Sequence, residues 1–232
     1  MGEELRQEKF GGMGGGISNP CEPHMACVLL LDTSGSMSGA PIDSLNKGIR
    51  DFISQTSLDE LAQKRVDVAI IEFNDTVRLV QDFTPLPKME PVTLTADGCT
   101  AMGQAINFAI DKVKERNHFY DDMGTPCFRP WIFMITDGVP TDDITAAAER
   151  IKIEENKGEY GKIKFWACGV PGADVEFLKN LSRRVIMLDE KKFDGIFDWM
   201  SKSMVTISVS RVGENPQLPD LNKDAQAIPG NW

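Results

Sequence analysis

The sequence predicts an α/β domain with a doubly wound, mostly parallel sheet and helices on both faces. Short apolar runs such as residues 27–32 and 131–136 are typical of strands buried on both faces. They alternate with segments in which apolar residues recur at helical spacing. A length of 232 residues fits one domain with tails, and a hydrophobic content of 41% is enough for a sizeable core.

The elements follow one another in a regular order. Strands are predicted at residues 27–32, 66–73, 76–80, 131–136, 163–170 and 185–188, the third being a short edge strand that turns back on the second. Helices are predicted from Pro41 to about residue 53 and at residues 102–113, 141–154 and 174–181, with a last one around 193–204. We expect a flexible arm at 1–22, one domain at 23–208 and an irregular tail at 209–232.

The charge balance excludes some classes of partner. The formal net charge is -10, and no cluster of Lys and Arg is long enough to bind nucleic acid phosphates. The longest apolar stretch is far too short to cross a bilayer, and the charged start lacks the apolar run of a secretory signal. Five cysteines without a CxxC pair fit the same view. We therefore expect a cytoplasmic protein that binds neither nucleic acid nor membrane.

Hydroxyl and carboxylate side chains lie next to three of the predicted elements. Asp32, Ser34 and Ser36 come directly after the first strand, Asp137 follows the strand at 131–136, and Thr100 precedes the helix at 102–113. In an open α/β sheet, ligands bind beyond the carboxyl ends of the strands. The three segments are therefore expected to meet at one edge. Taken alone, residues 32–36 equally fit a helix-capping turn.

Oxygen ligands of this kind suit a hard divalent cation. Magnesium prefers oxygen ligands in octahedral geometry, and manganese and calcium also accept them. The hydroxyls of Ser34, Ser36 and Thr100 can coordinate directly, while Asp32 and Asp137 can act through bound water or orient the hydroxyls. With a largely neutral set of ligands, the cation stays electrophilic and attracts a carboxylate from outside. That property suits a binding site more than a storage site.

The sequence here resembles a known family. DTSGS at 32–36, the later Thr100 and TDG at 136–138 are similar to the metal-ion-dependent adhesion site of von Willebrand factor A-type domains, over about residues 26–207. The resemblance implies a six-stranded sheet with one antiparallel edge strand, in which the first and fourth strands are neighbours. The longer stretches at residues 27–49, 96–106, 129–143 and 165–174 resemble the bacterial stand-alone subgroup related to tellurium-resistance-associated TerY and YegL-type proteins. That subgroup implies a cytosolic stress-response setting with a kinase or phosphatase as partner.

We interpret the chain as a metal-dependent protein-interaction module whose partner supplies an acidic side chain to the metal, and not as an enzyme. A metal sensor or buffer is the alternative, and a metal-dependent phosphoesterase is a weaker one. Catalysis by Ser34 or Ser36 needs a base, and the two histidines, His24 and His118, are expected at the opposite edge of the sheet.

Three further features are open from the sequence. Cys21, His24 and Cys27 are spaced like part of a zinc site but lack a fourth ligand. Met37 and Met102 fit either the rim of the metal site or the core. The segment 118–129 is interpreted as a long surface loop, with a second contact surface as the alternative. Asp142 and Asp143 are predicted to stand at the start of the helix at 141–154.

Overall fold

Seven strands form one sheet in the computed structural model, which describes residues 16–17, 19–157, 163–188, 193–221 and 225–228. The strands are β1 (Met25–Asp32), β2 (Val66–Phe73), β3 (Val77–Pro85), β4 (Trp131–Thr136), β5 (Lys164–Gly169), β6 (Val185–Leu188) and β7 (Ala225–Ala227). Their order is β3-β2-β1-β4-β5-β6-β7, and only β3 and β7 run antiparallel to their neighbours. The mostly parallel sheet and the antiparallel edge strand β3 are confirmed.

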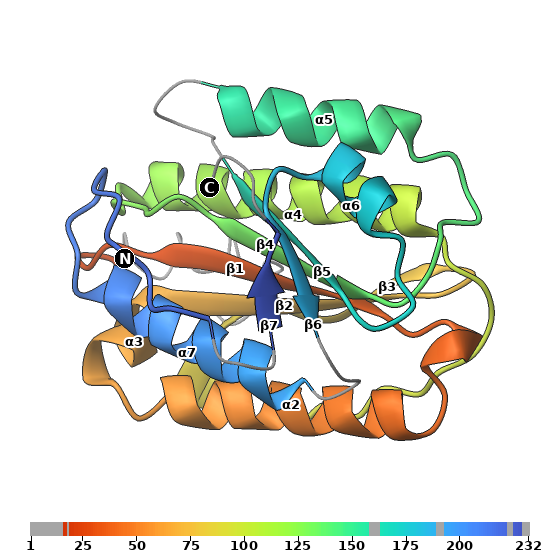
Figure 1. Ribbon diagram of the computed structural model, residues 1–232. Helices are drawn as coiled ribbons and strands as arrows, with labels where there is room; N and C mark the ends of the chain where they lie inside the picture. The colour runs from red at the N-terminus through yellow and green to blue at the C-terminus, as the bar shows by residue number, and fades with distance from the viewer. Residues whose placement is uncertain (1–15, 18, 158–162, 189–192, 222–224, 229–232) are drawn as a thin grey trace.

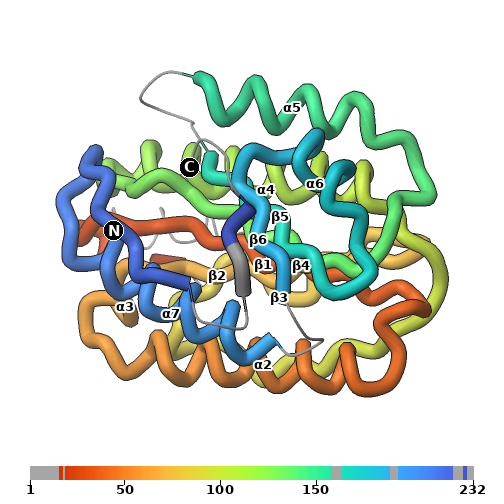
Figure 2. Tube along the Cα trace, viewed as in Figure 1, coloured from red at the N-terminus to blue at the C-terminus, as the bar shows by residue number. Residues whose placement is uncertain are grey.

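Helices cover both faces of the sheet (Figure 1), and Figure 2 shows the same layers as a trace of the chain. They are α2 (Ala40–Thr56), α3 (Glu60–Arg65), α4 (Met102–Met123), α5 (Thr145–Asn156), α6 (Val175–Leu181) and α7 (Asp194–Ser208), with short 3-10 turns η1 (Gly35–Met37) and η2 (Leu86–Lys88). One apolar core lies between the sheet and α2, α3 and α7, and a second lies between the sheet and α4, α5 and α6. No helix in the described part of the chain is long and apolar enough to cross a membrane.

Two predictions differ in part from the structure. The segment 118–129 is not a loop throughout, because α4 continues to Met123 and ends at Gly124, whose φ of 67° is the left-handed conformation that closes many helices. The helix continues because Arg116, Phe119 and Tyr120 prolong its buried face. The tail predicted to be irregular contains β7, which pairs with β6.

The ends of the chain lie partly outside the described residues. Most of the predicted arm, residues 1–15 and 18, and the last residues, 229–232, belong to this part. The described piece of the arm packs on the domain, since Thr125 donates a hydrogen bond to the Pro20 carbonyl (3.0 Å). In the tail, the Pro219 carbonyl accepts a hydrogen bond from Trp199 Nε1 (2.8 Å).

A buried polar network closes the amino-terminal end of the sheet. Asp67 Oδ2 on β2 contacts His24 Nδ1 (2.9 Å), Arg116 Nη2 (3.0 Å) and the Tyr120 hydroxyl (2.5 Å). All four residues are almost fully buried. Burial alone raises the pKa of Asp67, but the hydrogen bond with His24 and the charge of Arg116 outweigh it and hold the pKa below its ordinary value. The network therefore ties α4, β2 and the segment before β1 together.

Removing the carboxylate of Asp67 is expected to destabilise the fold strongly. Asp67→Asn leaves the buried guanidinium of Arg116 without its counter-charge, which costs about 3–5 kcal/mol of the free energy of unfolding. Because the folded-state pKa is lowered, this stability is present above the unfolded value of about 3.9 and is lost as the pH falls through the folded-state pKa. Urea denaturation should therefore show a difference between the two proteins at pH 7 that shrinks below about pH 4.

The matched control is Asp51→Asn, which removes an exposed carboxylate paired with Lys47 on α2. Its cost is expected to stay within about 0.5 kcal/mol. Equal losses for Asp51→Asn and Asp67→Asn would contradict the role given to the buried network.

The close approach of α2 and α7 depends on Gly48. A Cβ atom at this position would overlap the ring of Phe197. Gly48→Ala is therefore expected to destabilise the protein by about 1–3 kcal/mol through overpacking, although alanine favours helix by about 1 kcal/mol. Ser54→Ala, at an exposed position of the same helix, should change the free energy of unfolding by less than about 0.5 kcal/mol. A stabilised Gly48→Ala protein would rule out the tight contact.

Candidate functional site

The five predicted site residues meet at the carboxyl ends of the central strands. Asp32 is the last residue of β1, and Asp137 follows β4 directly. The two strands are parallel neighbours, with Leu31 paired to Ile135. Ser34 and Ser36 lie in the turn that contains η1, and Thr100 lies just before α4. The loops after β1 and β4 and the start of α4 thus share one end of the sheet (Figure 1).

A chain of hydrogen bonds connects the side chains. The hydroxyls of Ser34 and Ser36 are 3.1 Å apart, and Ser36 Oγ donates to Asp137 Oδ1 (2.8 Å). Asp32 Oδ1 accepts from the Ser34 backbone N–H (2.9 Å), and Asp32 Oδ2 accepts from Thr136 Oγ1 (2.6 Å). A side-chain hydroxyl therefore orients each carboxylate, that of Thr136 at the end of β4 for Asp32 and that of Ser36 for Asp137.

Gly138 shows where Thr100 joins this group. A Cβ atom on Gly138 would lie 3.5 Å from Thr100 Oγ1 and 3.7 Å from Asp32 Oδ2. Both oxygens therefore border the same small volume, which a larger residue at 138 would fill. The structure brings together all five residues that the sequence predicted.

Backbone hydrogen bonds fix the loops to one another. Gly35 N–H donates to the Gly98 carbonyl (3.0 Å) and Asp97 N–H to the Thr33 carbonyl (2.8 Å). Thr100 and Thr141 exchange two bonds, from Thr141 N–H to the Thr100 carbonyl (2.9 Å) and from Thr100 N–H to Thr141 Oγ1 (3.1 Å). These bonds join the three loops to one another and so position the hydroxyls of both Ser34 and Thr100.

Three further residues support the site in roles that the sequence analysis did not assign. Thr136 orients Asp32, Thr141 holds the loop of Thr100, and Asp142 accepts hydrogen bonds from the N–H groups of Gly103 and Gln104 (both 2.9 Å). Asp142 therefore caps α4, not the helix that follows it in sequence. Asp143 does stand at the start of α5, as predicted, and accepts from Thr145 N–H (2.8 Å). The hydroxyl between Ile135 and Asp137 was the only available signal for Thr136.

The burial of the site is graded toward solvent. Asp32 is fully buried and Ser34 and Thr100 nearly so, whereas Ser36 is exposed and Asp137 half-buried. Burial raises the pKa of Asp32, the hydrogen bonds from Ser34 and Thr136 oppose this, and the charge of Asp137 raises it again. A cation beside Asp32 would offset the cost of burying its charge. One side of the site remains open to a ligand from solvent.

The donor set fits a hard divalent cation. Two carboxylates balance a charge of +2, and three neutral hydroxyl oxygens surround them, which matches the oxygen preference of magnesium, manganese and calcium. Among the residues that the structure describes, no group of three or more His, Cys, Asp or Glu side chains could hold a metal. The hydroxyl-rich cluster is thus distinct from a carboxylate cage or a thiolate site.

The zinc-like spacing near the start of the domain does not form a site. Both ring nitrogens of His24 have protein partners, Asp67 Oδ2 at 2.9 Å and the Asn19 carbonyl at 3.0 Å. Cys21 is exposed, while Cys27 is buried inside β1. Burial raises the pKa of the Cys27 thiol to about 12, which disfavours the thiolate that zinc requires.

The two methionines near the site do not form its rim. Met37 and Met102 are fully buried, so both belong to the core. The exposed apolar side chain beside the site is Val139, which is 63% accessible and follows Gly138 directly. Val139 is therefore available to contact a partner next to the open side.

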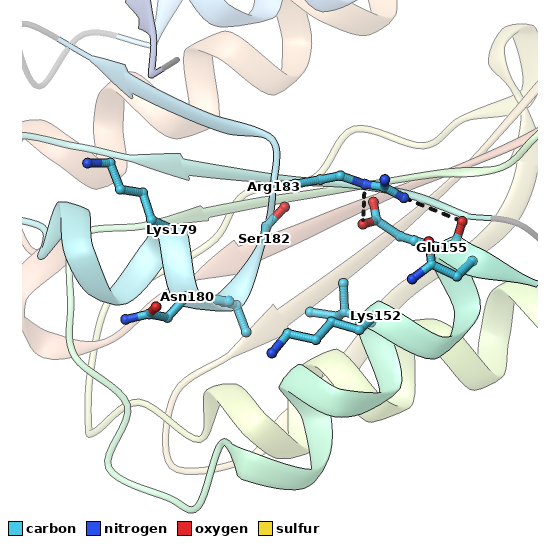
Figure 3. A pocket seen from close by; sticks show the side chains of 9 residues that line it. Lys152, Glu155, Lys179, Asn180, Ser182 and Arg183 are labelled. Atoms are coloured by element: carbon cyan, nitrogen blue, oxygen red, sulfur yellow. Dashed lines mark hydrogen bonds and ion pairs between the residues drawn. The ribbon is translucent and has the colours of Figure 1, made fainter. Parts of the chain in front are cut away.

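A separate hollow of about 210 Å³ lies between α5 and α6 (Figure 3). Lys152, Lys179 and Arg183 are among its lining residues, and Arg183 Nε binds Glu155 Oε2 (3.0 Å). The hollow includes none of the five predicted site residues. It therefore lies apart from the candidate metal site.

Solved structures share the fold at low identity. They include the pilus adhesin SpaC from Lactobacillus rhamnosus GG in an open conformation (TM-score 0.63, 15% identity, 84% of this chain and 31% of that one). They also include a von Willebrand factor type A structure from Catenulispora acidiphila (0.57, 15%, 79% and 43%) and the PilB minor pilin from Streptococcus sanguinis (0.57, 13%, 82% and 63%). The chain spans less than two thirds of each of these proteins. No curated protein matches it.

A family model agrees with the fold and covers the site. The model of the von Willebrand factor type A domain matches residues 27–189, well over half of the 232 residues. The matched range contains all five residues at the carboxyl ends of β1 and β4. The chain therefore belongs to the von Willebrand factor type A domain family.

Proposed function

We propose that this chain is a protein-binding module that depends on a divalent cation held by Asp32, Ser34, Ser36, Thr100 and Asp137. The convergence of three neutral hydroxyls with only two carboxylates, open to solvent on one side, carries the proposal. The cation is Mg²⁺, with Mn²⁺ or Ca²⁺ as substitutes. When bound, it offers an electrophilic position to an acidic side chain of the partner.

The protein's own residues have distinct parts in this function. Asp32, fixed by Ser34 N–H and Thr136, supplies the buried negative charge. Ser36, exposed and bonded to Asp137, lies at the boundary with solvent where a partner arrives. Val139 offers an apolar contact beside it. The loops around the site give specificity through such contacts.

The similar structures support a binding role. One is described as a pilus adhesin and another as a minor pilin. As the motif resemblance to tellurium-resistance-associated proteins implies, the proposed partner is a kinase or phosphatase of a bacterial stress response, and the proposed location is the cytoplasm.

Catalysis is not part of the proposed function. The two histidines lie away from the site, His24 in the buried network before β1 and His118 exposed in the second half of α4. A serine of the site therefore has no histidine base within reach. A phosphoesterase whose turnover of phosphoproteins or nucleotides disappears in Asp137→Ala would contradict this part of the proposal.

Metal is expected to stabilise the wild-type protein. A ligand at about 100 times its dissociation constant adds roughly 2.7 kcal/mol, or about 5–10 °C in the midpoint of thermal unfolding for a domain of this size. Magnesium, manganese or calcium chloride, compared with EDTA, should produce this shift. Asp32→Asn should abolish it. In EDTA, Asp32→Asn should be at least as stable as wild type, because it removes a buried negative charge.

Asp97→Asn is the matched control for the loss of one carboxylate. Asp97 is exposed in the loop before Thr100, and its Oδ1 accepts only from Gly98 N–H (2.8 Å) among the hydrogen bonds of its side chain in the described chain. Its metal shift should equal that of wild type. An equal loss in Asp97→Asn and Asp32→Asn would reduce the effect to general surface charge.

A small carboxylate should complete the site. With metal present, acetate at about 100 mM should raise the unfolding midpoint further, whereas acetamide, its neutral isostere, should not, at matched ionic strength. The acetate effect should vanish in EDTA and in Asp32→Asn. A metal shift without any acetate effect would favour the sensor or buffer alternative over partner binding.

A further inference from the structure

A cavity of about 600 Å³ lies at the end of the sheet opposite the candidate metal site. It is bounded by the second half of α4, the end of α5, the starts of β4 and β5, and the segment 212–216 after α7. Its size falls within the range of small-molecule sites. Apolar lining comes from Phe128, Trp131 and Ile207.

Four cationic side chains line this cavity in a chain whose net charge is -10. Two of them, Lys114 and Lys157, share the carboxylate of Glu154, at 3.5 Å and 2.7 Å. The other two, Arg129 and Lys164, are half-buried and form no ion pair with any residue that the structure describes. The cavity thus holds two cations without a carboxylate in ion-pair contact among the described residues.

The sheet fixes these two cations next to each other. Lys164 pairs in register with Trp131, and Lys164 N–H donates to the Pro130 carbonyl (2.8 Å), directly after Arg129. Lys164 Nζ lies 5.3 Å from the centroid of the Trp131 ring. Burial and the neighbouring charge of Arg129 lower the pKa of Lys164 to about 8. Burial and the charge of Arg183 lower the pKa of Arg129, against the opposing charge of Glu155. The two side chains therefore repel each other in a partly dry environment.

The nearby carboxylates are engaged or lie on the rim. Glu155 is bound to Arg183 (3.0 Å), as Figure 3 shows, and also to Arg184. Asp121 and Glu214 line the cavity but are exposed, and Glu214 already accepts from Arg211 N–H (2.9 Å). An anion from outside is thus the available counter-charge for Arg129 and Lys164.

We propose that this cavity binds a small phosphate monoester, with the phosphate between Arg129 and Lys164 and an apolar group against the wall of Phe128 and Ile207. A phosphate monoester carries nearly two negative charges at pH 7 and so matches two cations, whereas a carboxylate matches only one. The guanidinium of Arg129 offers the paired donors that phosphate oxygens accept. The site is independent of the metal-binding proposal, because it shares no residue with it.

The test is calorimetric titration of the full chain with phenyl phosphate at pH 7 in EDTA, which separates the result from any metal site. Saturable binding is expected, with a dissociation constant of about 1 mM or lower. Arg129→Gln and Lys164→Gln should each weaken it about tenfold or more. Inorganic phosphate should bind more weakly than phenyl phosphate, because it lacks the apolar group, and benzoate more weakly because it lacks the second charge.

The matched control is Lys152→Gln, an exposed lysine of the separate hollow in Figure 3, and it should leave the affinity unchanged. If Arg129→Gln fails to fold, Arg129→Lys replaces it and should still weaken binding, because the paired donors are lost. No saturation up to about 10 mM, benzoate binding as tight as that of phenyl phosphate, or an equal loss in Lys152→Gln would each overturn the proposal.

Discussion

The parallel pairing of β1 with β4 at the centre of the sheet is the constraint on which the candidate site depends. It places residues that are more than a hundred positions apart within hydrogen-bonding distance, as Thr136 and Asp32 show at 2.6 Å. Because both strands are buried on both faces, neither can slip without exposing apolar side chains to water. The relative positions of the five site residues therefore depend mainly on the packing of the core strands and less on the conformation of the loops.

Much of the fold follows from local sequence, and the exceptions have physical reasons. The bounds of β2, β4 and β6 agree with the prediction, because predominantly apolar runs end there at polar or turn residues. The six-residue helix α3 was missed, since it is too short to show periodicity, although Asp59 caps it in the usual way. The strand β7 depends on a partner about 40 residues away, and its own three residues carry no signal.

The candidate site shows the same division between local and tertiary information. Asp32, Ser34, Ser36, Thr100 and Asp137 could be named from sequence because each stands at the end of a recognisable element. The support of Thr100 by Thr141 and the capping of α4 by Asp142 could not, because both join segments that lie about 40 residues apart. The cavity at the opposite end of the sheet could not be predicted from sequence either, because the proximity of Arg129 and Lys164 follows only from the pairing of β4 with β5.

The short strand β7 also determines how the sheet ends. An open edge strand presents unpaired N–H and C=O groups on which another chain can add, which is a common route to aggregation. The edge formed by β3 has register shifts against β2, and irregular pairing of this kind discourages such addition. At the other edge, β7 occupies the free side of β6. Both β7 and α7 lie beyond residue 189, where the family match ends. A recombinant fragment that ends at that boundary would leave β6 as the edge strand of the sheet and the core face under α7 uncovered.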